Sequence, residues 1–232
     1  RETNELMDEK LPRDKMTNAH DGPVTVRSLK RQIDGALGPH GAWLLEPYSD
    51  KADSTGLATT PVAQMRTAAQ AAFEAGYQVC IHAIGDRANH EVLNAYEQLR
   101  KYEKENHLPA LRHRIEHAQV IHPDDAPRLA KLNVIASMQP IHATSDMLMA
   151  DQFWGERAKL AYAWKAQLDF GAPLALGSDA PVESPNPFWG LRAAVTRQRA
   201  DGSPSADGWR AEQKLSMPEA FAGYTLGAAY AA

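Results

Sequence analysis

The stretch LALGSDAPVES (174–184) carries a short apolar run to an aspartate, Asp179, and then enters a proline-rich loop. With the two-residue alternation of a strand, Ala175, Gly177 and Asp179 lie on one face, and the intervening leucines point toward covering helices. An aspartate at this place can start a turn or cap a helix. A functional role for Asp179 therefore requires polar partners at the ends of other strands.

The rest of the chain alternates between strand-like and helix-like segments. Helical spacing of apolar residues, as in PVAQMRTAAQAAFEAG (61–76), alternates with short β-like runs. We expect strands over 23–33, 77–82, 111–118, 133–140 and 172–179, and helices over 61–76, 86–105, 123–132, 187–200, 217–229 and from 140 to about 168. This alternation predicts an α/β fold with a parallel sheet covered by helices, forming one domain or part of one.

The composition is that of an ordinary soluble globular protein, with 232 residues, 44% hydrophobic and 23% charged. A net charge of -4 gives no electrostatic reason to expect nucleic acid or an anionic membrane as a partner. The single cysteine, Cys80, excludes an internal disulfide and is compatible with a reducing compartment, so we expect a cytoplasmic protein. The first residues lack an initiator Met and a signal peptide, and the chain is expected to be the inner part of something longer.

Four polar residues fall at or just after the ends of the expected strands. His82, His117 and Asp179 end three of them, and His142 lies two residues beyond a fourth. Carboxyl ends of neighbouring parallel strands share one edge of a sheet, so these side chains can converge. One histidine alone is more often an ordinary hydrogen-bonded residue. Four such residues at successive strand ends favour a site for a first-row metal, most plausibly zinc.

These residues lie in segments that resemble a known family. The segments CIHAIGDRANH (80–90), RHRIEHAQ (112–119), SMQPIH (137–142) and LGSDAPVESPNP (176–187) resemble the amidohydrolase superfamily, in its amidohydrolase-3, YtcJ-like branch. LKRQIDGALG (29–38), in which three residues separate a lysine from the following Asp-Gly, is similar to the same branch. The resemblance runs from about residue 24 to the C-terminus.

The resemblance implies a (β/α)8 TIM barrel that holds one or two metal ions, usually zinc. His82 and His117 would be the histidine ligands of strands five and six, and Asp179 the aspartate of strand eight. Lys30 would be the bridging residue of strand four. A cationic lysine cannot bind zinc, so the resemblance implies a carboxylated lysine, whose two carbamate oxygens can bridge two metals. The alternative for Lys30 is a solvated or salt-bridged lysine.

One departure from the family pattern is large. The family begins with a His-x-His pair on strand one, and the sequence contains no such pair. We therefore expect residues 1–232 to form one partial domain, comprising about strands 4 to 8, without strands one to three and without the small β domain. Five strands cannot close an eight-stranded barrel, and open edges expose unpaired backbone. We expect a missing N-terminal segment or a partner chain to close it, with a homo-oligomer as one form.

The activity implied is that of a metal-dependent hydrolase that opens an amide or similar C–N bond, other than a peptide bond, with a metal-activated water. Asp179 would be the catalytic residue that takes the proton of the water and passes it to the leaving amine. His142 and Arg87 are the candidates for binding the carbonyl or carboxylate of a small-molecule substrate.

Two alternatives remain open at this point. HRIEH (113–117) fits H-x-x-E-H, a zinc-peptidase signature in which His113 and His117 would bind the metal and Glu116 would be the base. That interpretation requires a helix, whereas the β/α order predicts a strand here. The other alternative is a metal-free, non-catalytic remnant used for assembly or binding.

Overall fold

A five-stranded parallel sheet organises the molecule. The computed structural model describes residues 16–19 and 22–232. The strands are β3 (Ser28–Gln32), β4 (Gln78–Ala83), β5 (Arg114–His117), β6 (Ile135–Met138) and β7 (Leu174–Leu176). Their order in the sheet follows their order in the chain, and every neighbouring pair is parallel. The carboxyl ends of all five strands therefore lie at one edge.

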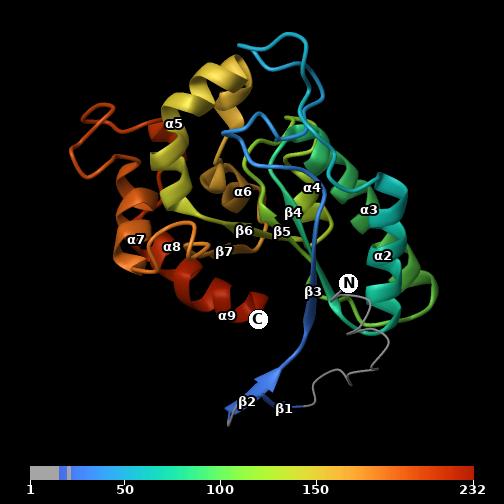
Figure 1. Cartoon of the computed structure of the whole chain (residues 1–232). Helices are drawn as coiled ribbons and strands as arrows, with labels where there is room; N and C mark the ends of the chain where they lie inside the picture. Colours follow the sequence, from blue (N-terminus) through green and yellow to red (C-terminus); the bar gives the residue numbers. More distant parts are fainter. Residues whose placement is uncertain (1–15, 20–21) are drawn as a thin grey trace.

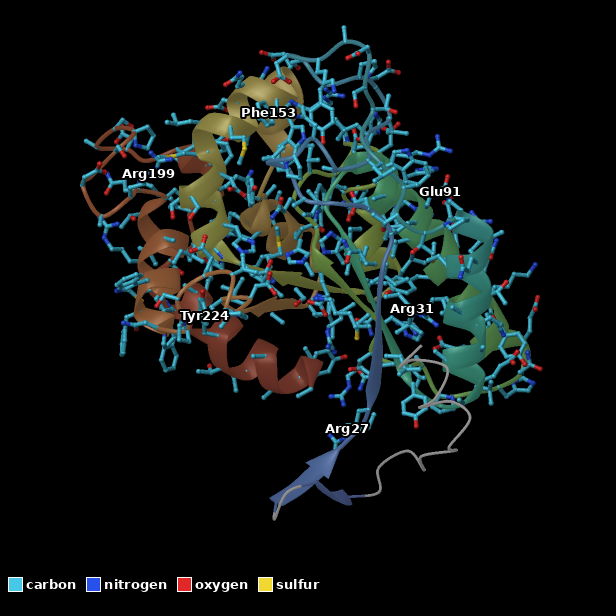
Figure 2. The ribbon with its side chains drawn as sticks, in the orientation of Figure 1. Arg27, Arg31, Glu91, Phe153, Arg199 and Tyr224 are labelled. Carbon is cyan, nitrogen blue, oxygen red and sulfur yellow. The ribbon has the colours of Figure 1, made fainter. Side chains whose placement is uncertain are left out.

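Helices connect the strands of the sheet and follow the last one. They are α2 (Val62–Glu74), α3 (Asp86–Glu105), α4 (Arg128–Lys131), α5 (Pro140–Trp154), η1 (Gly155–Leu160), α6 (Trp164–Phe170), α7 (Pro187–Thr196), η2 (Ala211–Gln213), α8 (Met217–Ala222), a π-helical segment η3 (Gly223–Gly227) and α9 (Ala228–Ala231). In Figure 1, α2 and α3 lie on the side of β3 and β4, whereas α5, α7 and α8 lie on the side of β6 and β7. Figure 2 shows Arg31 and Glu91 on the first side, and Phe153 and Arg199 on the second. This arrangement is the α/β fold that the sequence predicts.

Helix α3 packs on the sheet through one stripe of apolar side chains. Its apolar side chains recur three and four residues apart, which forms one buried stripe of Val92, Tyr96 and Leu99. The Tyr96 hydroxyl donates hydrogen bonds to the backbone oxygens of Val79 and Arg114. The stripe therefore attaches α3 to both β4 and β5, and Asp86 at its start lies next to the carboxyl end of β4.

One face of the sheet carries polar side chains and the other carries apolar ones. The strand register pairs Lys30 with Cys80 and Cys80 with Arg114, so these side chains share one face, which we call the polar face. His82 and Glu116 form the next paired row on that face. The alternate residues Val79, Ile81 and Ile115 are buried against the helices. Alternation along β3 to β5 thus directs the polar side chains away from the helical layer.

Some expected elements differ from the structure. The single strand expected over 23–33 is two strands, since β2 (Gly22–Thr25) pairs with β1 (Met16–Ala19) in an antiparallel hairpin and only β3 joins the main sheet. The helix expected over 123–132 is confined to α4, which is preceded by turns. His142 lies within α5, because Pro140 starts that helix two residues after β6 ends. In the described part of the chain, every helix is too short or too polar to cross a membrane.

Candidate metal centre

Three histidine rings form a row across the carboxyl ends of the strands. His82 is the next-to-last residue of β4, His117 is the last of β5, and His142 lies in the first turn of α5. The ring centroids of His82 and His117 are 4.5 Å apart, and those of His117 and His142 are 5.8 Å apart. The structure therefore brings together the three histidines that the sequence places at or just after the ends of successive strands.

Asp179 completes a compact set of ligand atoms at one end of this row. It lies three residues after β7. One ligand atom each from His117, His142 and Asp179 lie within 4.8 Å of one another. His142 Nε2 is 4.0 Å from Asp179 Oδ2. Two imidazoles and one carboxylate are a donor set suited to zinc or another divalent first-row metal. Within the described residues, this set includes neither His82 nor Lys30.

Unusual backbone conformations aim two of these side chains. His117 has φ +77° and Asp179 has φ +57°, in the left-handed region that few non-glycine residues occupy. Alternation would place His117 on the helix side with Ile115, because the preceding Glu116 pairs with His82 on the polar face. The left-handed backbone at His117 breaks that alternation and brings its ring next to His82. Such strain is concentrated at functional sites.

Gln139 fixes the orientation of the His117 ring. His117 Nδ1 lies 2.8 Å from Gln139 Oε1, and Gln139 Nε2 donates to the backbone oxygen of Ser137 at 3.3 Å. Because an amide oxygen only accepts, the proton of the neutral ring lies on Nδ1. His117 Nε2 therefore keeps its lone pair, which is the form that binds a metal.

The charge state of the histidines also fits a metal ion. Burial lowers the pKa of His82 to about 3, and the positive charges of His117 and Lys30 act in the same direction. Burial also lowers the pKa of His117 and of His142. The buried Nε2 atoms of His82 and His142 make no hydrogen bond among the described residues, and the nearest acidic oxygens are those of Asp34 at 3.4 Å and Asp179 at 4.0 Å, respectively. Neutral imidazoles whose buried nitrogens make no hydrogen bond are suited to coordinating a metal or holding a polar ligand.

Lys30 lies in the middle of β3 and has an exposed side chain. Its positive charge contributes to the lowered pKa of both His82 and His117. Lys30 is therefore on the same side of the sheet as these rings, one row below His82 in the strand register.

Asp34 is a buried carboxylate at this site to which sequence analysis assigned no role. It accepts hydrogen bonds from the backbone N–H groups of Trp43, Ile84 and Gly85, and its Oδ1 is 3.4 Å from His82 Nε2. Burial raises the pKa of Asp34 to about 7. These contacts attach the loop after β3 to the end of β4. In the sequence, only the position of Asp34 in an Asp-Gly pair after an expected strand could have indicated a role. The N–H groups of Ile84 and Gly85 that bind it are distant in sequence.

Arg87 lies at the start of α3, where it contacts Trp43 and Glu91. Its guanidinium is 5.4 Å from the centroid of the Trp43 ring and pairs with Glu91 at 2.9 Å. It lines a cavity of about 750 Å³ with the start of α3, residues of η1 and residues of the loops after β3 and β5, drawn from 45–46, 86–87, 120–123 and 156–160. None of the three histidines of the row lines this cavity. Arg87 thus lines a cavity that the row of histidines does not line, and its role in binding substrate stays a prediction.

The H-x-x-E-H alternative is wrong, because Arg114–His117 is a strand and the motif requires a helix. His113 is fully buried and stacks on Tyr96 with ring centroids 5.3 Å apart. Its Nδ1 accepts a hydrogen bond from the backbone N–H of Val79. His113 therefore packs between the sheet and α3, and only His117 belongs to the row of histidines.

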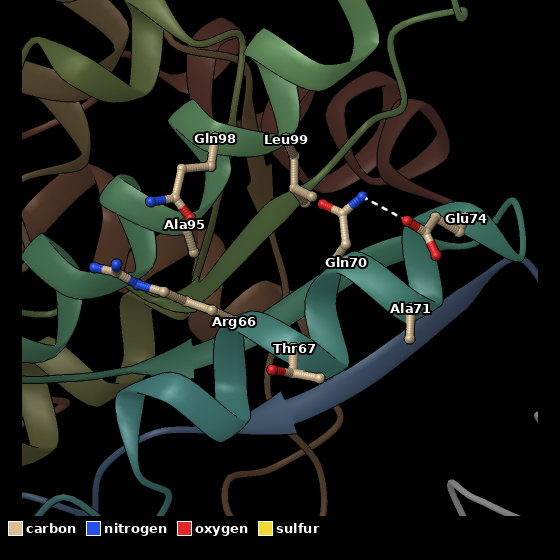
Figure 3. Close-up of a pocket in the computed structure, with 8 residues that line it drawn as sticks. All are labelled: Arg66, Thr67, Gln70, Ala71, Glu74, Ala95, Gln98 and Leu99. Atoms are coloured by element: carbon tan, nitrogen blue, oxygen red, sulfur yellow. Dashed lines mark hydrogen bonds between the residues drawn. The ribbon is translucent and has the colours of Figure 1, made fainter. Parts of the chain in front are cut away.

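A second hollow lies on the outer layer. Figure 3 shows a groove between α2 and α3, lined by Arg66, Thr67, Gln70, Ala71, Glu74, Ala95, Gln98 and Leu99. Its volume is about 410 Å³, and Gln70 donates to Glu74 within it. No histidine, cysteine or residue of a strand end lines it. The row of histidines remains the better candidate for chemistry.

Comparison with known proteins gives consistent similarities. A family model described as "Amidohydrolase family" matches residues 4–232. Protein LONG AFTER FAR-RED 3 of Arabidopsis thaliana is 37% identical over 207 residues, covering 88% of this chain and 34% of that protein. Putative amidohydrolase YtcJ of Bacillus subtilis is 35% identical over 211 residues, covering 90% of this chain and 38% of that protein.

The fold is similar to that of solved structures. An uncharacterized metal-dependent hydrolase from Pyrococcus horikoshii superposes with a TM-score of 0.83 at 29% identity, covering 98% of this chain and 44% of that one. A second, from Pyrococcus furiosus, gives a TM-score of 0.78 at 30% identity with the same coverage. The chain spans about a third of the length of the two relatives from Arabidopsis thaliana and Bacillus subtilis.

Proposed function

The chain belongs to the amidohydrolase family, and from this membership we propose that it forms the metal-binding part of a hydrolase that cleaves an amide or related C–N bond. The observation that carries the proposal is the row of buried His82, His117 and His142 rings next to Asp179 at the carboxyl ends of parallel strands. Such an edge is where active sites of parallel α/β folds are built.

We propose His82, His117, Asp179 and Lys30 as the residues that hold one or two divalent ions, with zinc as the preferred metal. Lys30 would take part as a carbamate, since its exposed amine on β3 can react with carbon dioxide. A bound metal would polarise the scissile carbonyl and lower the pKa of a water molecule. The lowered pKa of His82 and of His117 keeps both rings neutral at pH 7, as metal ligands require.

Asp179 and His142 would carry out the proton transfer and the binding of the substrate carbonyl. Asp179 would accept the proton of the attacking water and pass it to the leaving amine, which leaves poorly unless it is protonated. His142, 4.0 Å from Asp179 through Nε2, would hold the carbonyl oxygen of the substrate. N-acyl and N-formyl compounds are the substrate class that the proposal favours.

For the fold, we propose that β3 to β7 are the last five strands of a (β/α)8 barrel. The sequential parallel order of the five strands supports this interpretation, because it is the order in such barrels. The remaining strands would come from another part of the complete protein or from a partner chain.

The test uses the complete protein. Metal content is measured first, and activity is then assayed on a panel of N-acyl and N-formyl amides. We expect His82→Gln to lose both metal and turnover, whereas the matched buried substitution His113→Gln keeps the metal. Equal metal content in the His82→Gln and unaltered proteins, with turnover retained, contradicts the proposal.

A further inference from the structure

Helix α5 presents His142 and two large apolar side chains on the same face. Met149 and Phe153 follow His142 by seven and eleven residues, a spacing that places all three on one side of the helix. Met149 is two turns beyond His142, a rise of about 10 Å. Its side chain is half-buried, whereas that of Met147, two positions earlier, is fully buried. The face of α5 above His142 therefore offers an apolar side chain that solvent reaches.

The loop between β3 and α2 lies against this face of α5. Gly38 is directed at Met149, since a Cβ atom placed on Gly38 would be 3.8 Å from the Met149 sulfur. The ring of His40 stacks on that of Phe153 with centroids 4.0 Å apart, and the backbone N–H of Ser49 donates to the backbone oxygen of Phe153. Figure 2 shows Phe153 at the end of α5 beside this loop. Gly38 and Met149 thus form one apolar surface, which we call the apolar wall.

Hydrogen bonds hold the loop at two places, so the apolar wall is preformed. At its start, Asp34 accepts hydrogen bonds from the backbone N–H groups of 84–85, just beyond β4. Farther along, the guanidinium of Arg157 donates to the backbone oxygens of 46–47. The loop therefore runs from the end of β4 to α5, the two elements that carry the first and last rings of the row of histidines. A preformed surface binds a ligand without the cost of ordering a mobile segment.

We propose that Gly38 and Met149 are specificity-determining residues that bind an apolar, straight-chain acyl group of the substrate, whose carbonyl lies at His142. The inference rests on the proposed function for the position of the carbonyl. Met149 suits this role because its unbranched thioether side chain adapts to an apolar partner. Gly38 leaves room for the chain because it has no side chain. An acyl chain that spans about 10 Å reaches Met149, whereas a formyl or acetyl group does not.

The test compares the binding of a short and a long product acid to the complete, zinc-loaded protein. Calorimetry should show octanoate binding at least about tenfold more tightly than acetate, because its chain buries more apolar surface. Gly38→Leu places a side chain against Met149 and should reduce the affinity for octanoate to that for acetate. The backbone of Gly38 lies outside the left-handed region, so leucine is not strained there. Leu148→Ala removes an exposed neighbour on α5 and is the matched control, which should leave both affinities unchanged.

A second measurement reads the contact itself and keeps the inference testable if Gly38→Leu fails to fold. The chain has seven methionines, whose methyl groups can be labelled with 13C and observed by NMR. The Met149 signal is assigned by its loss in Met149→Leu. Octanoate should shift this signal both with zinc and in the metal-free protein, and acetate should not. The exposed Met217 at the start of α8 is the internal control, and its signal should stay in place.

Three results overturn the inference, even in a protein that hydrolyses amides. They are equal affinities for acetate and octanoate, an unchanged Met149 signal with octanoate, and octanoate binding that a folded Gly38→Leu variant does not weaken. The methyl signal of the metal-free protein depends on neither activity nor metal. If octanoate shifts the Met149 signal but no amide is hydrolysed, only the proposed function fails.

Discussion

His117 Nδ1 lies 2.8 Å from Gln139 Oε1, and this contact leaves the other ring nitrogen of His117 free to bind a metal. Gln139 is buried, and its amide nitrogen is held by the backbone oxygen of Ser137. The glutamine therefore cannot exchange its amide ends without losing a hydrogen bond. Gln139 thus supplies the hydrogen bond that a metal-binding histidine makes with its second ring nitrogen.

Replacing Gln139 should weaken metal binding without removing a ligand. Gln139→Met takes away the acceptor for the His117 Nδ1 proton, and loss of such a partner lowers metal affinity by about 10–100-fold. Competition with a chromophoric chelator measures the effect. Gln98→Met on the exposed face of α3 is the control and should bind metal normally. Equal affinity of the two variants would show that the contact does not serve the metal.

Asp179→Asn should separate chemistry from folding. Asparagine tolerates the left-handed backbone found at Asp179, so Tm should change little. Turnover should fall by about a hundredfold or more, because the amide cannot carry the proton to the leaving amine. Steady-state kinetics and a thermal melt of the same preparation measure both. Near-normal turnover with a lowered Tm would identify Asp179 as a turn residue only.

His113→Ala should affect stability and not the metal. It leaves a cavity against Tyr96 and a buried backbone N–H at Val79 without its acceptor. The free energy of unfolding should fall by about 2–5 kcal/mol. Denaturant titration gives this value, and metal analysis of the folded variant should match the unaltered protein. Selective loss of metal from a stable variant would restore the peptidase interpretation.

Acid should destabilise the metal-free protein through His82. The folded protein holds the pKa of His82 near 3, below its ordinary 6.5. The unfolded chain therefore takes up a proton as pH falls below 6.5, while the folded state does not. Between pH 7 and pH 5, this linkage removes about 2 kcal/mol from the free energy of unfolding. This destabilisation by His82 is absent above pH 7 and stops increasing near pH 3, where the folded state also takes up the proton.

The matched variant for this effect is His82→Gln, which has no titrating group. Both proteins are measured with chelator present at pH 7 and at pH 5. The loss in the free energy of unfolding between these two pH values should be about 2 kcal/mol smaller in the variant than in the unaltered protein. Parallel pH profiles for the two proteins would show that His82 titrates normally in the folded state.

The strand and helix order could be predicted because apolar spacing in this sequence is regular. The helix expected over 86–105 has the bounds of α3, and the strand expected over 77–82 differs from β4 by one residue at each end. Family membership was also predicted correctly. The division of 23–33 into β2 and β3 depends on pairing with β1, which strand-like composition does not reveal.

The details of the site depend on contacts between distant residues. The left-handed backbone at His117 has no local signal, because no glycine or asparagine marks it. Two of the three backbone N–H groups that bind Asp34, those of Ile84 and Gly85, lie about 50 residues away in the chain. Gln139 lies near an expected strand end in the sequence, but its contact with His117 depends on the folded arrangement of β5 and β6.

Metal analysis of the complete, purified protein is the most direct test that a metal lies at the strand ends. Elemental analysis of the unaltered protein should find about one or two zinc ions, or other first-row divalent ions, per chain. His117→Gln should lose most of this metal while its far-ultraviolet circular dichroism is unchanged. A folded complete protein that hydrolyses an amide without bound metal, or that keeps its full metal content in His117→Gln, would contradict the account.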